Sequence, residues 1–474
     1  MEALIMREVR LRSHQSVAYT TNLICNSTPG ETAFELPEAQ LKVQPVPANS
    51  DPALQAALLG VWFDELWALL HPAAFTTPGL SQTLAKVVFP DNDDTAAPPG
   101  SFERVVAHIN RRRTQRSADL ELHFANSFQE ELDKLSKDAD LISWCEIFFT
   151  QSILRQKRPD PLQRSSHQRF YSFIVIPDNL LETEPGRQIL QAMSKVDAVY
   201  LQTDIYLRRV ARQLEKMKLP IPELHRFDLS PDSVALRQAV RESPPSSTLI
   251  ATLDPHQILL VRDALATRHQ ISHRFICLDR LDPIKGIHVV LEAVDKFLSS
   301  RNQTIDQLRA QYRFYFLMDY YTRFPPVDLN LAWHRYANWI RTQQIPKFKE
   351  RWQGMVYFAD NIPDRFIVAH LLVDAHVISG GIQEGLGLAV QEGLVVNHEV
   401  GLGRTVIMGN GAGFPIQAIE EGLGQFGFFT PAGDPDAFAQ AIHDVVALDP
   451  QIHFSNTSEM VEKFITPHNH RLLP

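Results

Sequence analysis

Cysteine is scarce in this chain of 474 residues, which contains only Cys25, Cys145 and Cys277. Their number is odd and none of them has the spacing of a metal-ligand pair, so the pattern argues against a disulfide framework and a zinc site. We therefore expect reduced thiols, no bound metal ion and a cytoplasmic protein.

Long apolar runs and an excess of positive charge are also missing. No segment approaches the roughly 20 apolar residues of a membrane span, and residues 1–16 lack the continuous apolar core of a signal peptide. The formal net charge is −9, which argues against nucleic acid or an acidic membrane surface as the main partner. These absences predict a protein with no membrane and no nucleic-acid partner.

The composition is that of a folded protein, with 44% hydrophobic and 21% charged residues. The chain is too long for one ordinary core, and strand-like segments alternate with helical patterns, as in parallel α/β sheets. We expect an α/β protein with two facing Rossmann-like domains and a cleft between them. The weaker pattern between 220 and 272 divides it into an N-terminal domain (1–265), a C-terminal domain (266–450) and a short polar tail (451–474). Residues 26–52 are predicted to form a long loop.

One stretch, residues 274–298, combines a buried strand, a polar turn and a helix. Short apolar runs precede Arg280, and after Lys285 apolar residues recur at helical spacing. Both cations should therefore lie at the carboxyl end of a strand, which is where open α/β sheets bind ligands. Two cations beside the start of a helix suit a phosphate or diphosphate.

A second stretch, residues 373–396, repeats this architecture around a glycine-rich turn. Glu384 and Glu392 are eight positions apart, which is roughly 12 Å along a helix axis. That reach suits a nucleotide diphosphate sugar, with one carboxylate on sugar hydroxyls and the other on the ribose. Glycines let backbone N–H groups approach a diphosphate, and the N–H groups expected to do so belong to Gly385, Leu386, Gly387 and Leu388.

Five segments follow one another in an order that resembles the trehalose-6-phosphate synthases: DRLDPIKGI, YYTR, VYFADNIPDRF, DAHVISGGIQEGLGLAVQEGL and GNGAG. The resemblance is good over about 270–445 and faint before it. It implies a retaining glycosyltransferase with two Rossmann-like domains, the GT-B architecture. The segment EGLGLAVQE also looks like the Glu–seven–Glu motif of other retaining enzymes with that fold.

The resemblance implies roles for individual residues of the second half. Arg280 and Lys285 match the pair that holds the donor diphosphate, and Glu392 matches the carboxylate on the ribose. Glu384 stands where the synthases usually have an Asp on the donor-sugar hydroxyls. No cofactor or metal ion is implied, because the two cations stabilise the departing diphosphate.

The first half departs from the family. A Ser-Asn-Arg strand end is here Thr21-Asn22-Leu23, which lacks the cation for an acceptor phosphate. A His-Asp-Tyr-His strand end is here 145–148, where only the carboxylate of Glu146 is retained. We expect Asn22 and Glu146 as acceptor contacts.

These residues predict a front-face retaining transfer, independent of metal, from a nucleotide diphosphate sugar to a small sugar or sugar-phosphate-like acceptor. Two alternatives remain open. One is a pseudo-glycosyltransferase that joins a nucleotide-activated cyclitol to an aminocyclitol phosphate through a C–N bond. The other is a non-catalytic nucleotide-sugar-binding relative. Donor base, donor sugar and acceptor stay undetermined, and the aromatic segment 61–75 suits either a core or the interface of a homo-oligomer.

Overall fold

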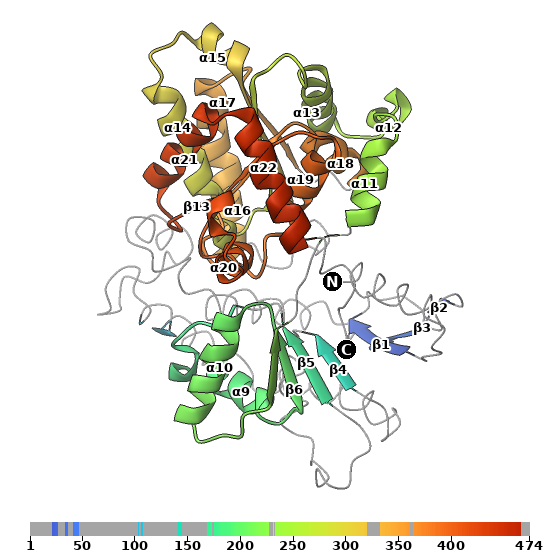
Figure 1. Ribbon diagram of the computed structural model, residues 1–474, viewed down its shortest axis with the longest axis vertical. Helices are drawn as coiled ribbons and strands as arrows, with labels where there is room; N and C mark the ends of the chain where they lie inside the picture. The colour runs from blue at the N-terminus through green and yellow to red at the C-terminus, as the bar shows by residue number, and fades with distance from the viewer. Residues whose placement is uncertain are drawn as a thin grey trace.

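The computed structural model describes residues 175–226, 231, 233–319, 332–360 and 364–465, five strands between residues 21 and 172, and residues 103, 106 and 107. Two bodies are visible in these parts (Figure 1). The upper body is built on a six-stranded sheet and the lower body on a four-stranded sheet. The expected α/β fold with parallel sheets is confirmed.

All six strands of the upper sheet are parallel. Their spatial order is β10 (Val356–Asp360), β9 (Tyr312–Asp319), β8 (His273–Arg280), β11 (His376–Ser379), β12 (Val406–Gly409) and β13 (Phe428–Thr430). In chain order this is third, second, first, fourth, fifth and sixth, which is the Rossmann arrangement. The order of strands reverses between β8 and β11, so their carboxyl ends form the switch point of the sheet.

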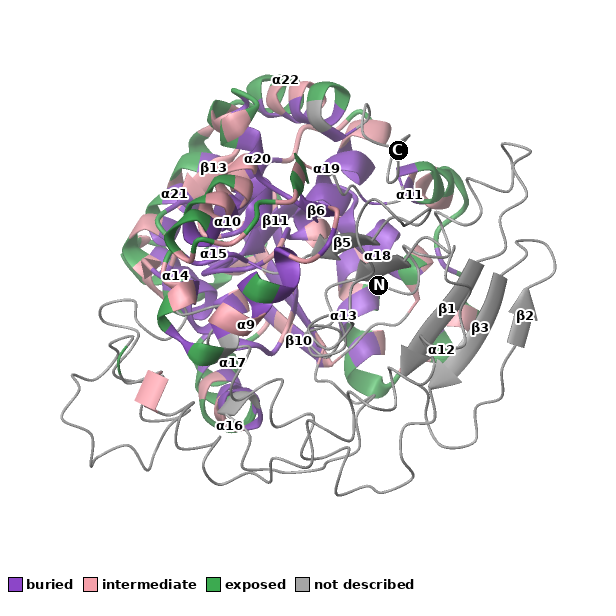
Figure 2. Ribbon diagram, turned by 90° about the horizontal axis from the view of Figure 1, so that it is seen from below, coloured by how far each residue is buried: buried purple, intermediate pink, exposed green. Residues whose placement is uncertain are grey.

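Helices cover both faces of this sheet because successive strand residues point to opposite faces. Phe275 and Cys277 join one core and Ile276 joins the other. The first core is covered by α14 (Ile287–Ser300), α15 (Ile305–Gln311), α16 (Ala332–Trp339), α17 (Ile345–Arg351) and α21 (Pro435–Ala447). The second is covered by α18 (Arg365–Leu372), α19 (Leu388–Glu399), α20 (Gly413–Glu420) and α22 (Pro450–Met460). Burial is concentrated on the sheet and on the inner sides of these helices (Figure 2). None of the helices in the described ranges has both the length and the apolar character that crossing a bilayer requires.

The lower body contains four parallel strands in sequential order: β4 (Leu141–Trp144), β5 (Gln168–Ser172), β6 (Ala198–Leu201) and β7 (Glu223–Arg226). Helices α9 (Glu184–Met193) and α10 (Asp204–Lys216) follow β5 and β6. A separate small sheet pairs β1 (Thr21–Asn26) parallel to β3 (Leu41–Val46), with β2 (Phe34–Leu36) antiparallel to β3. The prediction of a long loop over 26–52 is therefore wrong, because Phe34, Leu36, Leu41 and Val43 follow the alternating pattern of short strands.

Three helices before β8 pack on the upper sheet: α11 (Ser233–Arg241), α12 (Ser247–Ala251) and α13 (Pro255–Ala266). Leu236, Ile250 and Leu260 from them share a core with residues of α18 and α19. We therefore propose that the second domain begins near residue 231 and not at 266. Part of the expected polar tail also packs in this body, since Met460 of α22 is fully buried.

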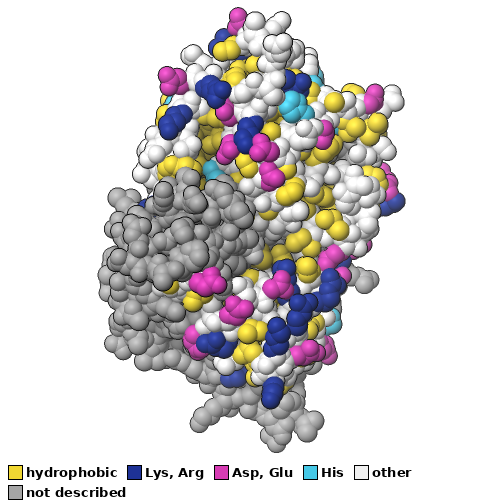
Figure 3. Space-filling view, turned by 90° about the vertical axis from the view of Figure 1, so that its left-hand side faces the viewer, with side chains coloured by type: hydrophobic (Ala, Val, Ile, Leu, Met, Phe, Trp, Pro, Cys, Tyr) yellow, Lys and Arg dark blue, Asp and Glu magenta, His cyan; other side chains and the backbone are white. Residues whose placement is uncertain are grey.

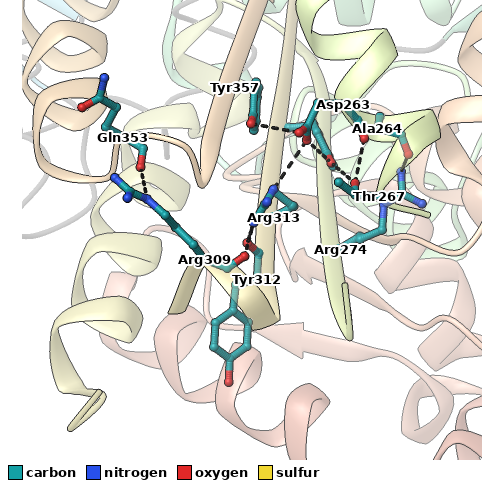
Figure 4. A network of polar contacts seen from close by, with 10 residues as sticks. Asp263, Ala264, Thr267, Arg274, Arg309, Tyr312, Arg313, Gln353 and Tyr357 are labelled. Atoms are coloured by element: carbon teal, nitrogen blue, oxygen red, sulfur yellow. Dashed lines mark hydrogen bonds and ion pairs between the residues drawn. The ribbon is translucent and has the colours of Figure 1, made fainter. Parts of the chain in front are cut away.

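A polar network fastens α13 to β9 and β10 (Figure 4). The carboxylate of Asp263 accepts hydrogen bonds from the hydroxyl of Tyr315 at 2.8 Å and from that of Tyr357 at 3.0 Å. Arg313 lies 3.5 Å from the same carboxylate. Arg274, which is 1% exposed, donates to the carbonyl oxygens of Ala264 and Val373. This network holds the segment before β8 to the sheet.

The half-buried His273 and the buried His376 lie at the amino ends of β8 and β11, and the buried His288 lies in the first turn of α14. Burial lowers the pKa of His273, helped by Arg404 and Arg301, to about 4. Burial also lowers the pKa of His288 to about 3 and that of His376 well below its usual value. The folded protein therefore keeps these rings neutral at pH values where the unfolded chain would protonate them.

We expect the free energy of unfolding to fall as the pH drops below about 6.5, because the unfolded state then binds more protons than the folded state. The free energy of unfolding should continue to fall toward pH 4. Each histidine contributes about 1.4 kcal/mol to this loss for every unit by which its pKa is lowered in the folded state. Urea unfolding followed by circular dichroism between pH 8 and 4.5 measures it. His376→Phe should reduce this pH dependence and His256→Ala, at an exposed position, should not. Equal pH dependence in both variants would contradict the explanation.

Candidate active site

The candidate site lies at the switch point between β8 and β11. These strands are parallel neighbours, with His376 opposite Phe275 and Val377 opposite Ile276. Arg280 is the last residue of β8, and Glu384 lies in the turn after β11. The two stretches singled out in the sequence are therefore brought together at one edge of the sheet.

The turn after β8 places Lys285. Asp282 begins a short 3-10 helix, Pro283–Lys285, and its side chain accepts a hydrogen bond from the N–H of Ile284 at 3.2 Å. Gly286 then takes a left-handed conformation, with φ of 63°, and α14 begins at the next residue. Because Lys285 ends the 3-10 helix, its side chain can reach back to the end of β8.

Lys285 joins two buried carboxylates. Its Nζ lies 3.2 Å from Oδ1 of Asp279 and is in direct contact with the carboxylate of Glu384. Ser379 of β11 donates a hydrogen bond of 2.7 Å to the other oxygen of Asp279. Glu384 is 1% exposed and Asp279 8%, so this cluster is nearly shielded from solvent.

Burial and charge act in opposite directions on these groups. Burial by itself lowers the pKa of Lys285, but the charges of Glu384 and Asp279 outweigh it and raise the pKa. Burial raises the pKa of Asp279 to about 6, although the charge of Lys285 opposes that rise. Lys285 therefore stays charged across the physiological range, where Asp279 also begins to take up protons.

The two turns touch through their backbones. The N–H of Ile382 donates to the carbonyl oxygen of Ile284 at 2.9 Å. A Cβ atom on Gly380 would lie 2.5 Å from the carbonyl oxygens of both Lys285 and Gly286. Only glycine fits there, and this close approach fixes the distance between Lys285 and the turn that carries Glu384.

A second glycine begins α19 beside Glu384. Gly387 has a φ of 80° and supplies no side-chain cap to the helix. A Cβ atom at this position would lie 2.3 Å from Cε of Met408 and 2.7 Å from Oε1 of Glu384. Because Gly387 has no side chain to cap the helix, the N–H groups of the first turn of α19 can serve an anion.

The two glutamates do not share a helix. Glu384 forms an isolated bridge with Ala412 and its carbonyl oxygen accepts from the N–H of Gly413 at 3.1 Å, whereas α19 begins at Leu388. The helical estimate of their separation is therefore wrong over this interval. Glu392 is in the second turn of α19, where Arg365 donates to its Oε1 at 2.5 Å.

Arg280 is more accessible than Lys285, with its side chain 33% exposed against 15%. Its guanidinium lies 3.7 Å from Oδ2 of Asp282. Over the described ranges, no group of three or more His, Cys, Asp or Glu side chains is arranged to hold a metal ion.

The expected acceptor contacts, Asn22 and Glu146, stay predictions. Glu146 lies outside the described residues, and of Asn22 the structure describes only the backbone, in β1 opposite Lys42. Sequence reasoning missed Asp279 and Arg365, which hold Lys285 and Glu392. The sequence could have indicated Asp279 as a site residue, since it is a carboxylate next to Arg280 at the end of an apolar strand.

Replacing Lys285 with Met should leave two buried carboxylates without their cation and lower the free energy of unfolding by about 3–5 kcal/mol. Adding Glu384→Gln should recover most of that loss, because one of the unpaired charges is then removed. Urea unfolding at pH 7.5 measures both effects.

Lys296→Met, in the helix α14 that follows Lys285, is the matched control, because Lys296 pairs with Glu292 and Asp436 at the surface. This substitution should lower the free energy of unfolding by less than about 1 kcal/mol. Equal losses at positions 285 and 296, or no recovery on adding Glu384→Gln, would show that the buried ion pair does not carry this stability.

Comparison with known proteins relates this architecture to one group of solved structures. No protein-family model matches the chain, and no curated protein matches it by sequence. An alpha,alpha-trehalose-phosphate synthase (UDP-forming) from Burkholderia xenovorans in complex with glucose-6-phosphate is similar over 94% of this chain and 88% of its own, with a TM-score of 0.67 and 13% identity.

Two further structures agree. The E. coli trehalose-6-phosphate structure bound with UDP-2-fluoro glucose is similar over 95% of this chain and 89% of its own, with a TM-score of 0.66 and 11% identity. The OtsA apo structure is similar over 99% of this chain and 96% of its own, with a TM-score of 0.71 and 11% identity. The chain therefore has the GT-B glycosyltransferase fold of the trehalose-6-phosphate synthases.

Proposed function

We propose that this protein is a retaining glycosyltransferase that moves a sugar from a nucleotide diphosphate sugar to a small sugar or sugar-phosphate-like acceptor. The observation that carries the proposal is the placement of Lys285. It lies at the switch point of a Rossmann sheet, between Asp279 and Glu384 and near the uncapped start of α19. A charged lysine and the backbone N–H groups of a helix start at such an edge suit a diphosphate.

The ligands of the structurally similar proteins support the class of substrates. One of those structures is bound with UDP-2-fluoro glucose and another with glucose-6-phosphate. In this chain, the proposed donor contacts are the cations Arg280 and Lys285, the carboxylates Glu384 and Glu392, and the N–H groups of Gly385, Leu386, Gly387 and Leu388. Glu392, held by Arg365, would accept hydrogen bonds from the ribose.

The contact between Lys285 and Glu384 suggests how the donor is received. Without a donor, each charge neutralises the other, which avoids the cost of a buried unpaired ion. We propose that the ammonium turns toward the diphosphate when the donor binds. The carboxylate of Glu384 is then available to accept hydrogen bonds from the donor-sugar hydroxyls.

The reaction would proceed on one face of the donor sugar. The bond between the anomeric carbon and the diphosphate oxygen breaks, and the acceptor hydroxyl forms a new bond to the same carbon from the same face. The proton of that hydroxyl passes to the departing phosphate oxygen, and a nucleoside diphosphate is released. Arg280 and Lys285 would stabilise the charge that develops on the leaving oxygens.

Mass spectrometry of reaction mixtures tests the proposal. Purified protein would be incubated with UDP-, GDP- and ADP-sugars together with pooled sugars, sugar phosphates and aminocyclitol phosphates. We expect a product with the donor's anomeric configuration, assigned by NMR. Arg280→Ala should lower kcat/KM by about 100-fold, as when one group that stabilises the transition state is removed.

Arg351→Ala is the matched control, because Arg351 is a half-exposed arginine whose partner, Asp295, lies on α14 away from the site. It should leave the rate unchanged. A product linked through nitrogen would replace this proposal with C–N coupling, and donor binding without any product or hydrolysis would favour a non-catalytic role. No binding of any nucleotide sugar would overturn the proposal.

A further inference from the structure

The C-terminal end of α20 is bonded to the lower body. Oε1 of Glu420 accepts a hydrogen bond from the N–H of Ile205 at 2.9 Å, and its Oε2 accepts from the N–H of Asp204 at 3.2 Å. These are the first two N–H groups of α10. The hydroxyl of the helix's own cap, Thr203, accepts from the next N–H group, that of Tyr206. Glu420 therefore completes the cap of a helix that belongs to the other domain.

Neighbouring contacts strengthen this junction. The side-chain amide of Gln417, which is 1% exposed, donates to the carbonyl oxygen of Gln202. Arg226 at the end of β7 pairs with Glu421. The guanidinium of Arg208 lies 3.6 Å from Oε1 of Glu420.

The charge of α10 favours a carboxylate at its start. Lys and Arg side chains gather on the side of the lower body where α10 lies (Figure 3), and Arg208, Arg209 and Arg212 belong to this helix. The positive end of the helix dipole adds to their field. A carboxylate held there by two N–H groups makes charge-assisted hydrogen bonds, which are stronger than neutral ones.

The other end of α20 is bonded to the proposed donor turn. The N–H of Gly413 donates to the carbonyl oxygen of Glu384, and the N–H of Phe414 to that of Leu386 at 3.0 Å. One helix of eight residues thus connects the donor turn to the lower body. Figure 1 shows α20 at the lower edge of the upper body, next to α10.

Two polar side chains of the lower body are buried behind this junction. The amide of Gln202 and the hydroxyl of Tyr206 have no hydrogen-bond partner among the described residues. Burial raises the pKa of Tyr206, Arg209 opposes that rise, and the charges of Glu384 and Glu420 add to it. Such unsatisfied groups are costly in a folded protein.

We propose that Glu420 is a positioning residue that sets how the lower body meets the donor turn. By capping α10, it holds Gln202 and the first turn of α10, which carries Tyr206, against α20, the helix whose other end is bonded to Glu384. An amide and a phenol together offer donors and an acceptor, which suits a polyhydroxylated ring. This inference rests on the proposed function, because the positioning matters only if two substrates must meet between the domains.

Hydrogen–deuterium exchange of Glu420→Ala tests the cap directly. The amides of Asp204 and Ile205 should exchange at least about tenfold faster than in the wild type, since each loses a hydrogen bond to a charged group. The amides of Tyr206 and Leu207 provide an internal control, because they are bonded to Thr203. They should stay protected if α10 remains folded.

Kinetics test the positioning. In Glu420→Ala, the affinity for the nucleotide should change by less than about threefold, because the proposed nucleotide contacts lie in the upper body. By contrast, kcat should fall by about 10- to 100-fold, because misplaced substrates react slowly. The loss of kcat should be smaller in Glu420→Gln, because the amide oxygen of the glutamine can still accept one hydrogen bond. Glu399→Ala is the matched control: Glu399 is a similarly buried carboxylate that binds Arg241 and Arg237 within the upper body.

The outcomes of these experiments distinguish a failure of the inference about Glu420 from a failure of the proposed function. Faster exchange at Asp204 and Ile205 with a loss of kcat, absent in Glu399→Ala, supports the inference. Unchanged exchange, or unchanged kcat in an active enzyme, overturns it and leaves the proposed function intact. Equal losses of kcat in Glu420→Ala and Glu399→Ala also overturn it, because they indicate a general loss of stability. A wild-type protein that neither binds nucleotide sugars nor forms a product overturns the proposed function itself.

Discussion

The buried ammonium of Lys285 can exist only because two carboxylates surround it, and their arrangement depends on the backbone. Asp279 comes from the end of β8, and Glu384 from the turn after β11. The hydrogen bond between Ile382 and Ile284, together with the space left by Gly380, brings the two turns into contact. Without that approach, three charges would be buried apart from one another, which is unfavourable.

Much of this fold could be predicted from the sequence. The strand, turn and helix over 274–298 follow from a short apolar run and then a helical repeat, and the structure has β8 and α14 there. The pairing of Lys285 with Glu384 could not be predicted, because it depends on β11 lying beside β8 although two other strands separate them in the chain. The packing of the helices over 233–266 with α18 and α19 could not be predicted for the same reason: packing across the sheet leaves no local pattern.

The two ends of the upper sheet have different electrostatic characters. The carboxyl end carries charges that stabilise one another and leaves Arg280 partly accessible. The amino end carries His273 and His376, which burial keeps neutral. Parallel strands make this separation possible, because every carboxyl end lies on the same edge. One edge can therefore be specialised for ligands while the other contributes to the pH dependence of stability.

The three turns that follow β8, β11 and β12 are packed backbone against backbone. Cβ atoms on Gly409, Gly411 and Gly413 would lie within 2.1 Å of carbonyl oxygens of the turn after β11. Sequence drift in this region is therefore limited by space as well as by chemistry, whatever reaction the site performs. A lineage could exchange its substrates through the first half of the chain and still retain these glycines.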